Sequence, residues 1–214
     1  VNSSLFNLSG SIRTVREAIT YLGFREVGGL TLQHGLRAAF PQSPELEQMW
    51  QRAAARGELM GMLGKSLGFD AWAAHSAGLF EECGKALLFR HSPSRYPALW
   101  AQASTDDCAL SLLEQQAFGV SHDVLGAALC ETWGLQPSAV HSVRHHVEVQ
   151  ATLNLPGQER HRAICALSAL AHRVMSLPAD IERCVDLVAR QLQIDPARIR
   201  AVMPSGTHRL ASAP

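Results

Sequence analysis

The sequence has no excess of either charge and no long apolar run. Its 19 Lys and Arg residues balance 19 Asp and Glu residues, and the isoelectric point is near 7.3. A balanced chain carries no long-range field that would gather nucleic acid or anionic lipid. No apolar segment approaches the ~20 residues that span a bilayer, and no basic and apolar leader opens the chain. We therefore expect a cytoplasmic protein with no nucleic-acid partner and no membrane contact.

The cysteines lack both pairing and metal-binding spacing. Five cysteines are scattered through the chain, and none belongs to a CxxC motif. This spacing is not typical of zinc ribbons or of disulfide frameworks. The pattern predicts small buried apolar side chains in a reducing compartment.

The alternation of apolar and polar residues that marks β-strands is also missing. Apolar residues recur instead at helical spacing almost throughout, which predicts an all-α fold. Short loops favour one compact multi-helix domain over residues 1–203, followed by a flexible tail at 204–214. Because the chain opens at Val1 rather than at Met, we expect a fragment or one domain of a longer protein.

Caps and prolines place the boundaries of the predicted helices. Ser43 and Pro44 supply a cap and a first-turn proline for a long helix through Leu67. Asp70 caps a helix that is predicted to continue to about Arg90. Further helices are predicted at roughly 11–23, 25–39, 104–118, 121–134, 137–146, 160–176, 180–193 and 196–203.

The segment GLFEECGKALLF, residues 78–89, places two adjacent glutamates in an otherwise apolar stretch. A charge withdrawn from water costs several kcal/mol unless a partner compensates it. On one continuous helix Glu81 lies opposite the apolar face and four residues before Lys85, which is the favourable order for an ion pair. The spacing therefore predicts a pair between Glu81 and Lys85. It offers no partner for Glu82.

Four histidines lie on predicted core helices, where metal chemistry is possible. Neutral imidazoles converging with carboxylates are what a zinc, iron or manganese site requires. The alternative is that these are ordinary polar residues at helix edges, and the spacing alone leaves both readings open. Adjacent histidines point about 100° apart on a helix, so one ion uses both only in an unusual arrangement. The metal-binding candidates are His122, His145, His146 and His172.

Four segments stand out in chain order: NSSLFNLSGSIRTVREAITYLG, LEQMWQRAAA, AGLFEECGKALLF and FGVSHDVLGAALCETWGLQPSAVHSVRHHVE. Together they resemble the HDOD domain of bacterial signalling proteins over roughly residues 1–175. HDOD domains look like relatives of the HD phosphohydrolases that have lost part of their metal site. The resemblance thus implies an HD-like helical fold.

The resemblance also implies an altered metal site at the two glutamates. In the catalytic relatives a metal-holding histidine-aspartate pair stands where Glu81 and Glu82 stand, in a GLL-HD-IGK context that reads GLF-EE-CGK here. An earlier metal-binding histidine of those relatives falls at about Arg52, and a cation there opposes a metal. We expect a vestigial site of Arg52, Glu81, Glu82 and Lys85, in which the guanidinium of Arg52 replaces the metal beside Glu82.

The histidines match the other half of that site. By resemblance, His122, His145 and His146 fall at positions that bind metal in the dinuclear relatives, and the last aspartate of those enzymes falls near His172. The half of the metal site at Arg52, Glu81 and Glu82 has therefore lost metal ligands of the catalytic relatives, while the other half keeps its histidines. We expect no bound metal and no cofactor.

The resemblance implies a non-catalytic signalling module that acts through protein-protein contacts, with a small ligand sensed in the vestigial cleft. Regulation of motility, of cyclic-dinucleotide signalling or of gene expression is the usual family setting. The alternative is a metal-dependent HD-type phosphohydrolase acting on a nucleotide or a cyclic dinucleotide. Family members usually carry several helices before the NSS segment, which are missing here. We expect a partner or a second copy to cover the face that they leave, so that a homo-oligomer is possible.

Overall fold

The computed structural model describes residues 43–103 and 106–204, together with six isolated positions: Thr14, Arg16, Glu17, Thr31, Gly35 and Phe40. Four predictions lie outside the described residues: the helices at 11–23 and 25–39, the first two residues of the helix at 104–118, the tail beyond Pro204, and the face left by missing N-terminal helices. The chain divides into two compact units, residues 1–43 and 44–214.

The described part of the second unit contains helices and no strand, which confirms the all-α prediction. A short 3-10 helix, η2, covers Pro178–Asp180. The α-helices are α3 (Pro44–Leu67), α4 (Ala71–Phe80), α5 (Cys83–His91), α6 (Tyr96–Gln102), α7 (Asp107–Phe118), α8 (His122–Thr132), α9 (Pro137–Thr152), α10 (Glu159–Ser176), α11 (Ile181–Leu192) and α12 (Pro196–Val202).

Local sequence signals explain where several of these helices begin and end. Pro44 occupies the first turn of α3, where its missing N–H would have no helical partner. The carboxylate of Asp70 accepts a hydrogen bond from the backbone N–H of Ala73 at 2.9 Å and caps α4. Asp106 caps α7 in the same way, with bonds from Cys108 and Ala109 at 2.9 and 3.0 Å.

Three predicted boundaries were wrong. The helix predicted from 71 to about 90 is interrupted at Glu81 and Glu82 and forms α4 and α5. The last two residues of the turn-rich HSPSRYP segment, Tyr96 and Pro97, begin α6, a helix that was not predicted. The helix α9 extends to Thr152, six residues beyond its predicted end, because Val147 and Val149 add two apolar residues to its buried side.

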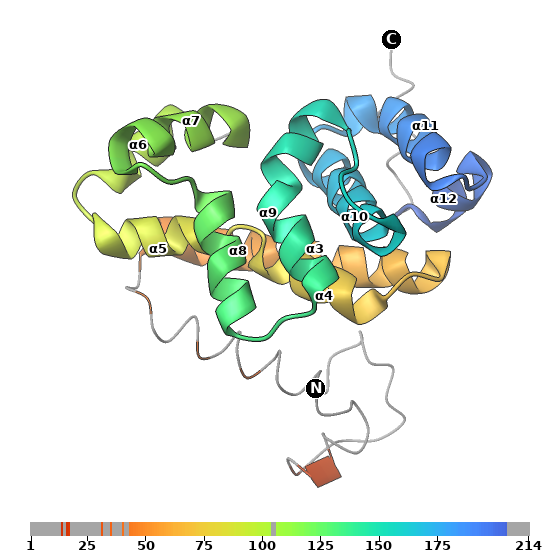
Figure 1. Cartoon of the computed structure of the whole chain (residues 1–214), viewed down its shortest axis with the longest axis horizontal. Helices are drawn as coiled ribbons and strands as arrows, with labels where there is room; N and C mark the ends of the chain where they lie inside the picture. The colour runs from red at the N-terminus through yellow and green to blue at the C-terminus, as the bar shows by residue number, and fades with distance from the viewer. Residues whose placement is uncertain are drawn as a thin grey trace. The chain divides into compact units, whose positions relative to one another are not determined.

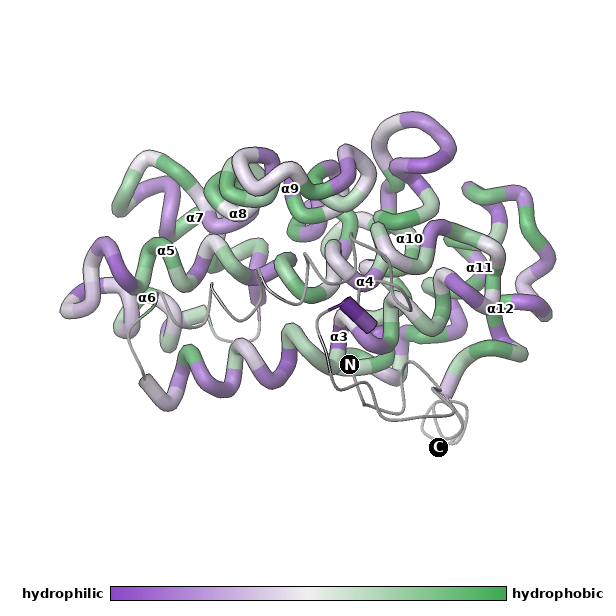
Figure 2. The backbone as a smooth tube through the Cα atoms, turned by 90° about the horizontal axis from the view of Figure 1, so that it is seen from below, coloured by the Kyte–Doolittle hydropathy of each residue, from purple (hydrophilic) through white to green (hydrophobic). Residues whose placement is uncertain are grey.

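The helices α6 and α7 lie at one end of this unit and α10, α11 and α12 at the other, with α8 and α9 between them (Figure 1). Apolar and polar residues alternate along α3, so that green and purple alternate on its trace (Figure 2). The helix α10 is buried on nearly every side between Ala163 and Ala171. It forms the centre of the main apolar core, which also takes side chains from α3, α4, α9, α11 and α12.

Candidate functional site

The two glutamates lie in the turn between α4 and α5, and both are buried: Glu81 is 0% exposed and Glu82 is 1% exposed. Glycines on either side of the turn allow close helix contacts. A Cβ atom added at Gly78 would lie 2.9 Å from the backbone oxygen of Arg56 on α3, and one added at Gly84 would overlap the backbone carbonyl of His122 on α8. The chain bends here because α4 packs on α3 while α5 packs on α8.

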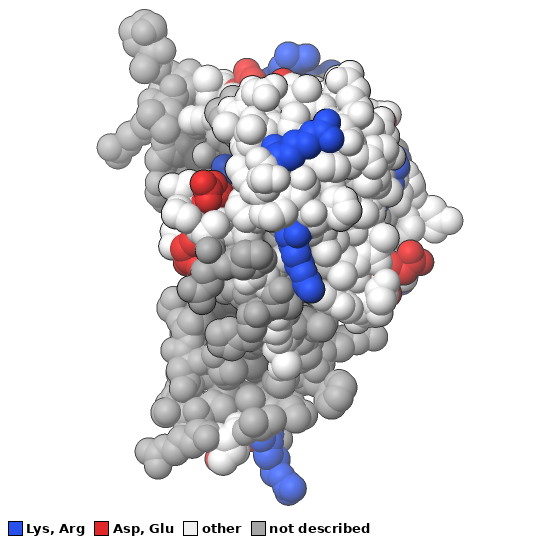
Figure 3. Space-filling model, turned by 90° about the vertical axis from the view of Figure 1, so that its left-hand side faces the viewer, with Lys and Arg blue, Asp and Glu red and all other residues white. Residues whose placement is uncertain are grey.

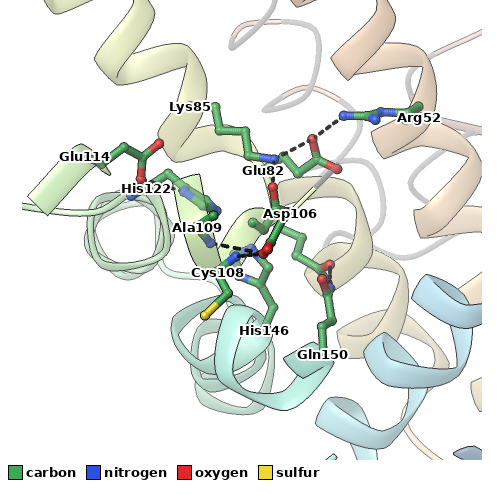
Figure 4. Close-up of polar contacts among 12 residues, drawn as sticks. Arg52, Glu82, Lys85, Asp106, Cys108, Ala109, Glu114, His122, His146 and Gln150 are labelled. Carbon is green, nitrogen blue, oxygen red and sulfur yellow. Dashed lines mark hydrogen bonds and ion pairs between the residues drawn. The ribbon is translucent and has the colours of Figure 1, made fainter. Parts of the chain in front are cut away.

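Three cationic side chains surround the carboxylate of Glu82. Arg52 and Arg56, one helical turn apart on α3, contact its two oxygens at 2.9 and 2.6 Å. The ammonium of Lys85 lies 3.2 Å away on α5. Figure 4 shows Arg52 and Lys85 reaching Glu82 from opposite sides. The predicted pair between Arg52 and Glu82 is present, and Arg56 is a further partner that was not predicted.

The charges around Glu82 decide its ionisation. Burial alone would raise the pKa of this carboxyl, but Lys85, Arg56 and Arg52 together lower the pKa well below its usual value. Burial would likewise lower the pKa of Arg56, but Glu81 and Glu82 raise it. Glu82, Arg56 and Lys85, with the half-exposed Arg52 at the edge, form a charged corner in which the buried groups neutralise one another.

Glu81 has different partners from those predicted. Its carboxylate accepts hydrogen bonds from Gln150 on α9 at 2.6 Å and from Ser168 on α10 at 2.8 Å, and Arg56 lies 3.4 Å away. The predicted pair between Glu81 and Lys85 was wrong because the helix breaks between them. Lys85 instead contacts Glu82 and, at 2.7 Å, Asp107 at the start of α7.

Two of the four candidate histidines converge. The rings of His122 on α8 and His146 on α9 are 5.3 Å apart between centroids, and both are buried. Glu114 on α7 accepts hydrogen bonds from the backbone N–H of His122 and from its ring Nδ1, both at 2.7 Å. The ring Nδ1 of His146 lies 2.7 Å from the backbone oxygen of Val143.

The other two histidines do not join this pair. His145 is partly exposed, lies 3.6 Å from Glu148 and packs against the ring of His141 on the same helix. Among the described residues, the group whose ligand atoms fall within 4.8 Å of one another consists of Asp107, His122 and His146, so His172 is outside it. Burial lowers the pKa of His172, as it does for His146.

Five residues of this region were not predicted from the sequence, for two different reasons. Arg56 repeats after Arg52 at the spacing of one helical face, so the pattern contained a signal for it. The others come from separate helices, and no spacing in the sequence places them together. They are Asp107, Glu114, Gln150 and Ser168.

A cavity of about 220 Å³ lies beside the charged corner. Arg52, Gln48 and Glu45 of α3 line one wall, and Trp100 of α6 contributes the aromatic part of the other. The side chain of Arg52 is 49% exposed, so its guanidinium faces this cavity while also contacting Glu82. The cavity therefore offers a small ligand one guanidinium, one carboxylate, an amide and an aromatic ring.

We expect the charge at Glu82 to make stability depend on acid. A carboxyl whose pKa is lower in the folded state contributes stability above its unfolded value, and loses it as the pH falls towards the folded value. The free energy of unfolding should therefore fall below pH 4.5, the ordinary value for this group. The slope from this group approaches about 1.4 kcal/mol per pH unit. Urea unfolding between pH 3 and pH 7 measures it, and an equally steep slope in the Glu82→Gln variant would contradict the assignment.

The fold and the site together define an all-α domain with a buried charged corner between its helices. The chain belongs to the HDOD domain family, whose model matches residues 1–149. This match confirms the family indicated by the four sequence segments.

Relatives of this chain are distant in sequence. An uncharacterized protein of Treponema pallidum (strain Nichols) is 26% identical over 149 residues, which cover 68% of this chain and 29% of that protein. The chain therefore spans less than a third of the curated relative that it matches.

Three solved structures share the fold. An HDOD domain protein from Geobacter sulfurreducens has a TM-score of 0.71 at 18% identity, covering 99% of this chain and 77% of that one. A candidate phosphohydrolase from Shewanella amazonensis SB2B has a TM-score of 0.66 at 17% identity, with 92% and 75% covered. The MmoQ response regulator from Methylococcus capsulatus strain Bath has a TM-score of 0.57 at 19% identity, with 89% and 75% covered. At these identities the similarity shows the fold alone.

No helix in the described ranges, 43–103 and 106–204, is both long and apolar enough to cross a bilayer. On the face drawn in Figure 3, the Lys and Arg side chains of the described residues are scattered and form no continuous basic patch.

Proposed function

We propose that this chain is a regulatory module of bacterial signal transduction, which works in the cytoplasm through protein-protein contacts and catalyses no reaction. Membership of the HDOD family supports the signalling role. The shared fold of a response regulator is consistent with it. The observation that carries the non-catalytic part is the surroundings of Glu82.

In HD phosphohydrolases, which the sequence resembles, the position of Glu82 belongs to the metal-holding pair. Here both oxygens of Glu82 are within 3.2 Å of cationic groups from Arg52, Arg56 and Lys85. With Glu81 and Asp107 included, three carboxylates face three cations, so the charges of the corner are already balanced without a metal ion. A divalent ion at Glu82 would have to displace buried cations and leave them without partners.

We propose that a small ligand binds in the cavity beside Arg52 and thereby changes the protein-protein contacts of the module. The guanidinium of Arg52 suits an anionic group, and the neighbouring Trp100 offers a flat apolar surface. A ligand bound to Arg52 competes directly with Glu82 for the same guanidinium. Ligand binding would thereby change the ion pairs of Glu82 without any chemical step.

A phosphatase and phosphodiesterase assay tests the absence of catalysis. The substrates are nucleoside monophosphates, diphosphates and triphosphates and cyclic dinucleotides, each supplied with Mg²⁺, Mn²⁺, Fe²⁺ or Zn²⁺ in turn. We expect no turnover above that of the His146→Ala variant, which lacks one candidate imidazole. Turnover by the wild type that disappears in this variant would overturn the proposal in favour of the phosphohydrolase.

A genetic experiment tests the regulatory part separately. In the source bacterium, we delete the part of the gene that encodes this chain. The deletion should change gene expression or behaviour, while the phosphodiesterase activity of the lysate stays the same. Unchanged gene expression and behaviour in the deletion strain would contradict a regulatory role, whatever the enzymatic assay shows.

A further inference from the structure

Three helix segments bring a carboxylate and two imidazoles together next to the charged corner. Asp107 begins α7, His122 begins α8 and His146 lies in the middle of α9. One ligand atom of each residue lies within 4.8 Å of those of the other two. This spacing is wider than that of donors bound to one ion, so an ion would have to draw the three groups together.

The hydrogen bonds of the two histidines leave the same ring nitrogen available on each. When Nδ1 of His122 donates to Glu114 and Nδ1 of His146 donates to the backbone oxygen of Val143, both Nε2 atoms carry a lone pair. Both Nε2 atoms are buried and have no hydrogen-bond partner among the described residues. Buried polar atoms of this kind are normally satisfied, so two of them on rings whose centroids are 5.3 Å apart indicate that something binds there.

Glu114 orients His122 in the way that carboxylates orient metal-binding histidines. Its second oxygen accepts the hydroxyl of Tyr96 at 2.5 Å, and the carboxylate is 0% exposed, so its position is fixed by two helices. A buried carboxylate behind an imidazole holds the ring in one orientation and makes Nε2 a better donor to a cation.

The charge around this group differs from that around Glu82. Asp107 and Glu114 supply two negative charges, and Lys85 supplies one positive charge at 2.7 Å from Asp107. Both imidazoles are uncharged when their Nε2 atoms are free to bind. The group is therefore net negative before binding, because Lys85 is shared with Glu82 and offsets at most one of its two carboxylates.

We propose that Asp107, His122 and His146 bind one divalent transition metal ion of the zinc class. Two imidazole nitrogens and one carboxylate oxygen suit zinc, iron or cobalt and disfavour magnesium and calcium, which prefer oxygen alone. The side chain of Asp107 is 18% exposed, which gives the ion a route from solvent. The ion would connect the first turns of α7 and α8 to the middle of α9.

This inference is independent of the proposed function. A structural ion that ties three helices together serves a regulatory module as readily as an enzyme. It excludes His145 and His172 from the ligand set and adds Asp107.

Metal titration of the untagged chain, stripped with a chelator and then dialysed, tests the proposal. Calorimetry with Zn²⁺ should give one site, and Co²⁺ should give the intense visible absorption of a four-coordinate ion. Removing an outer partner of a metal-binding histidine typically weakens affinity by about 10–100-fold. We expect a loss in that range for Glu114→Gln and a larger loss for Asp107→Asn and His146→Gln.

A surface histidine provides the matched control. His141 packs against His145 and His161 at centroid distances of 4.4 and 4.5 Å, so this cluster is the competing place for an adventitious ion. His141→Gln should leave the affinity of the tight site unchanged. The proposal is overturned if the wild type binds no ion, or if His141→Gln removes the site while Asp107→Asn retains it. Asp107→Asn is informative even if His146→Gln fails to fold, since Asp107 is partly exposed.

Discussion

Replacing Glu82 with glutamine is expected to lower the free energy of unfolding by about 3–5 kcal/mol, because it leaves buried cations without their main counter-charge. Arg56 and Lys85 are 4% and 1% exposed, so water cannot replace the lost carboxylate. Arg56 would keep only Glu81, and Lys85 only Asp107. The loss is a large share of the roughly 5–15 kcal/mol that stabilises an ordinary domain.

Urea unfolding at pH 7 measures this effect, and Arg52→Gln is its matched control. Both substitutions remove one charge from the same ion pair, but the side chain of Arg52 is 49% exposed. Solvent screens it, so we expect its loss to cost about 0–1 kcal/mol. Equal effects in the two variants would show that Glu82 is not the centre of a desolvated charge cluster.

Replacing Gly84 with alanine is expected to cost about 3 kcal/mol or more, because the new methyl group would overlap the backbone of α8. Its Cβ atom would collide with the carbonyl oxygen of His122 and lie 2.7 Å from the carbonyl carbon. Backbone cannot rotate away as a side chain does. The two helices must separate, which would pull Lys85 away from Asp107 and His122 away from Glu114.

Gly126→Ala is the control for the same helix contact. A Cβ atom at Gly126 would lie 3.3 Å from the backbone nitrogen of Gly84 and 3.3 Å from a methyl group of Val143, which small shifts relieve. We expect a loss of about 1 kcal/mol or less, at the mild end of overpacking. The midpoint of thermal unfolding, followed by circular dichroism, compares the two. A Gly84→Ala protein as stable as Gly126→Ala would contradict the close approach of α5 to α8.

The helices could be predicted from the sequence to a large extent, because their signals are local. Caps at Asp70 and Asp195 and the proline at the start of α3 act within a few residues of the helix that they begin. The interruption at Glu81 and Glu82 could not be predicted in this way. Helix propensity there is ordinary, and the chain bends because the two glycine contacts on α3 and α8 require it.

The site could be predicted only in part, because contacts between separate helices leave no local signal in the sequence. The family resemblance placed Arg52 opposite Glu82, and the structure contains that contact at 2.9 Å. It could not place Asp107, since the resemblance assigns no role to that position. The pairing of Lys85 was wrong because a rule for one continuous helix was applied across a break.

Because Lys85 pairs with two carboxylates at once, substitutions of these two acids affect each other. The single ammonium of Lys85 is shared by Glu82 from the turn and Asp107 from α7, at 3.2 and 2.7 Å. When one carboxylate is removed, the ammonium is free to move closer to the other, so the effects of the two removals will not add. A double-mutant cycle of these two acids should give a clear interaction energy. The amides of the α4–α5 turn and of the first turn of α7 should then exchange with deuterium as one cooperative unit.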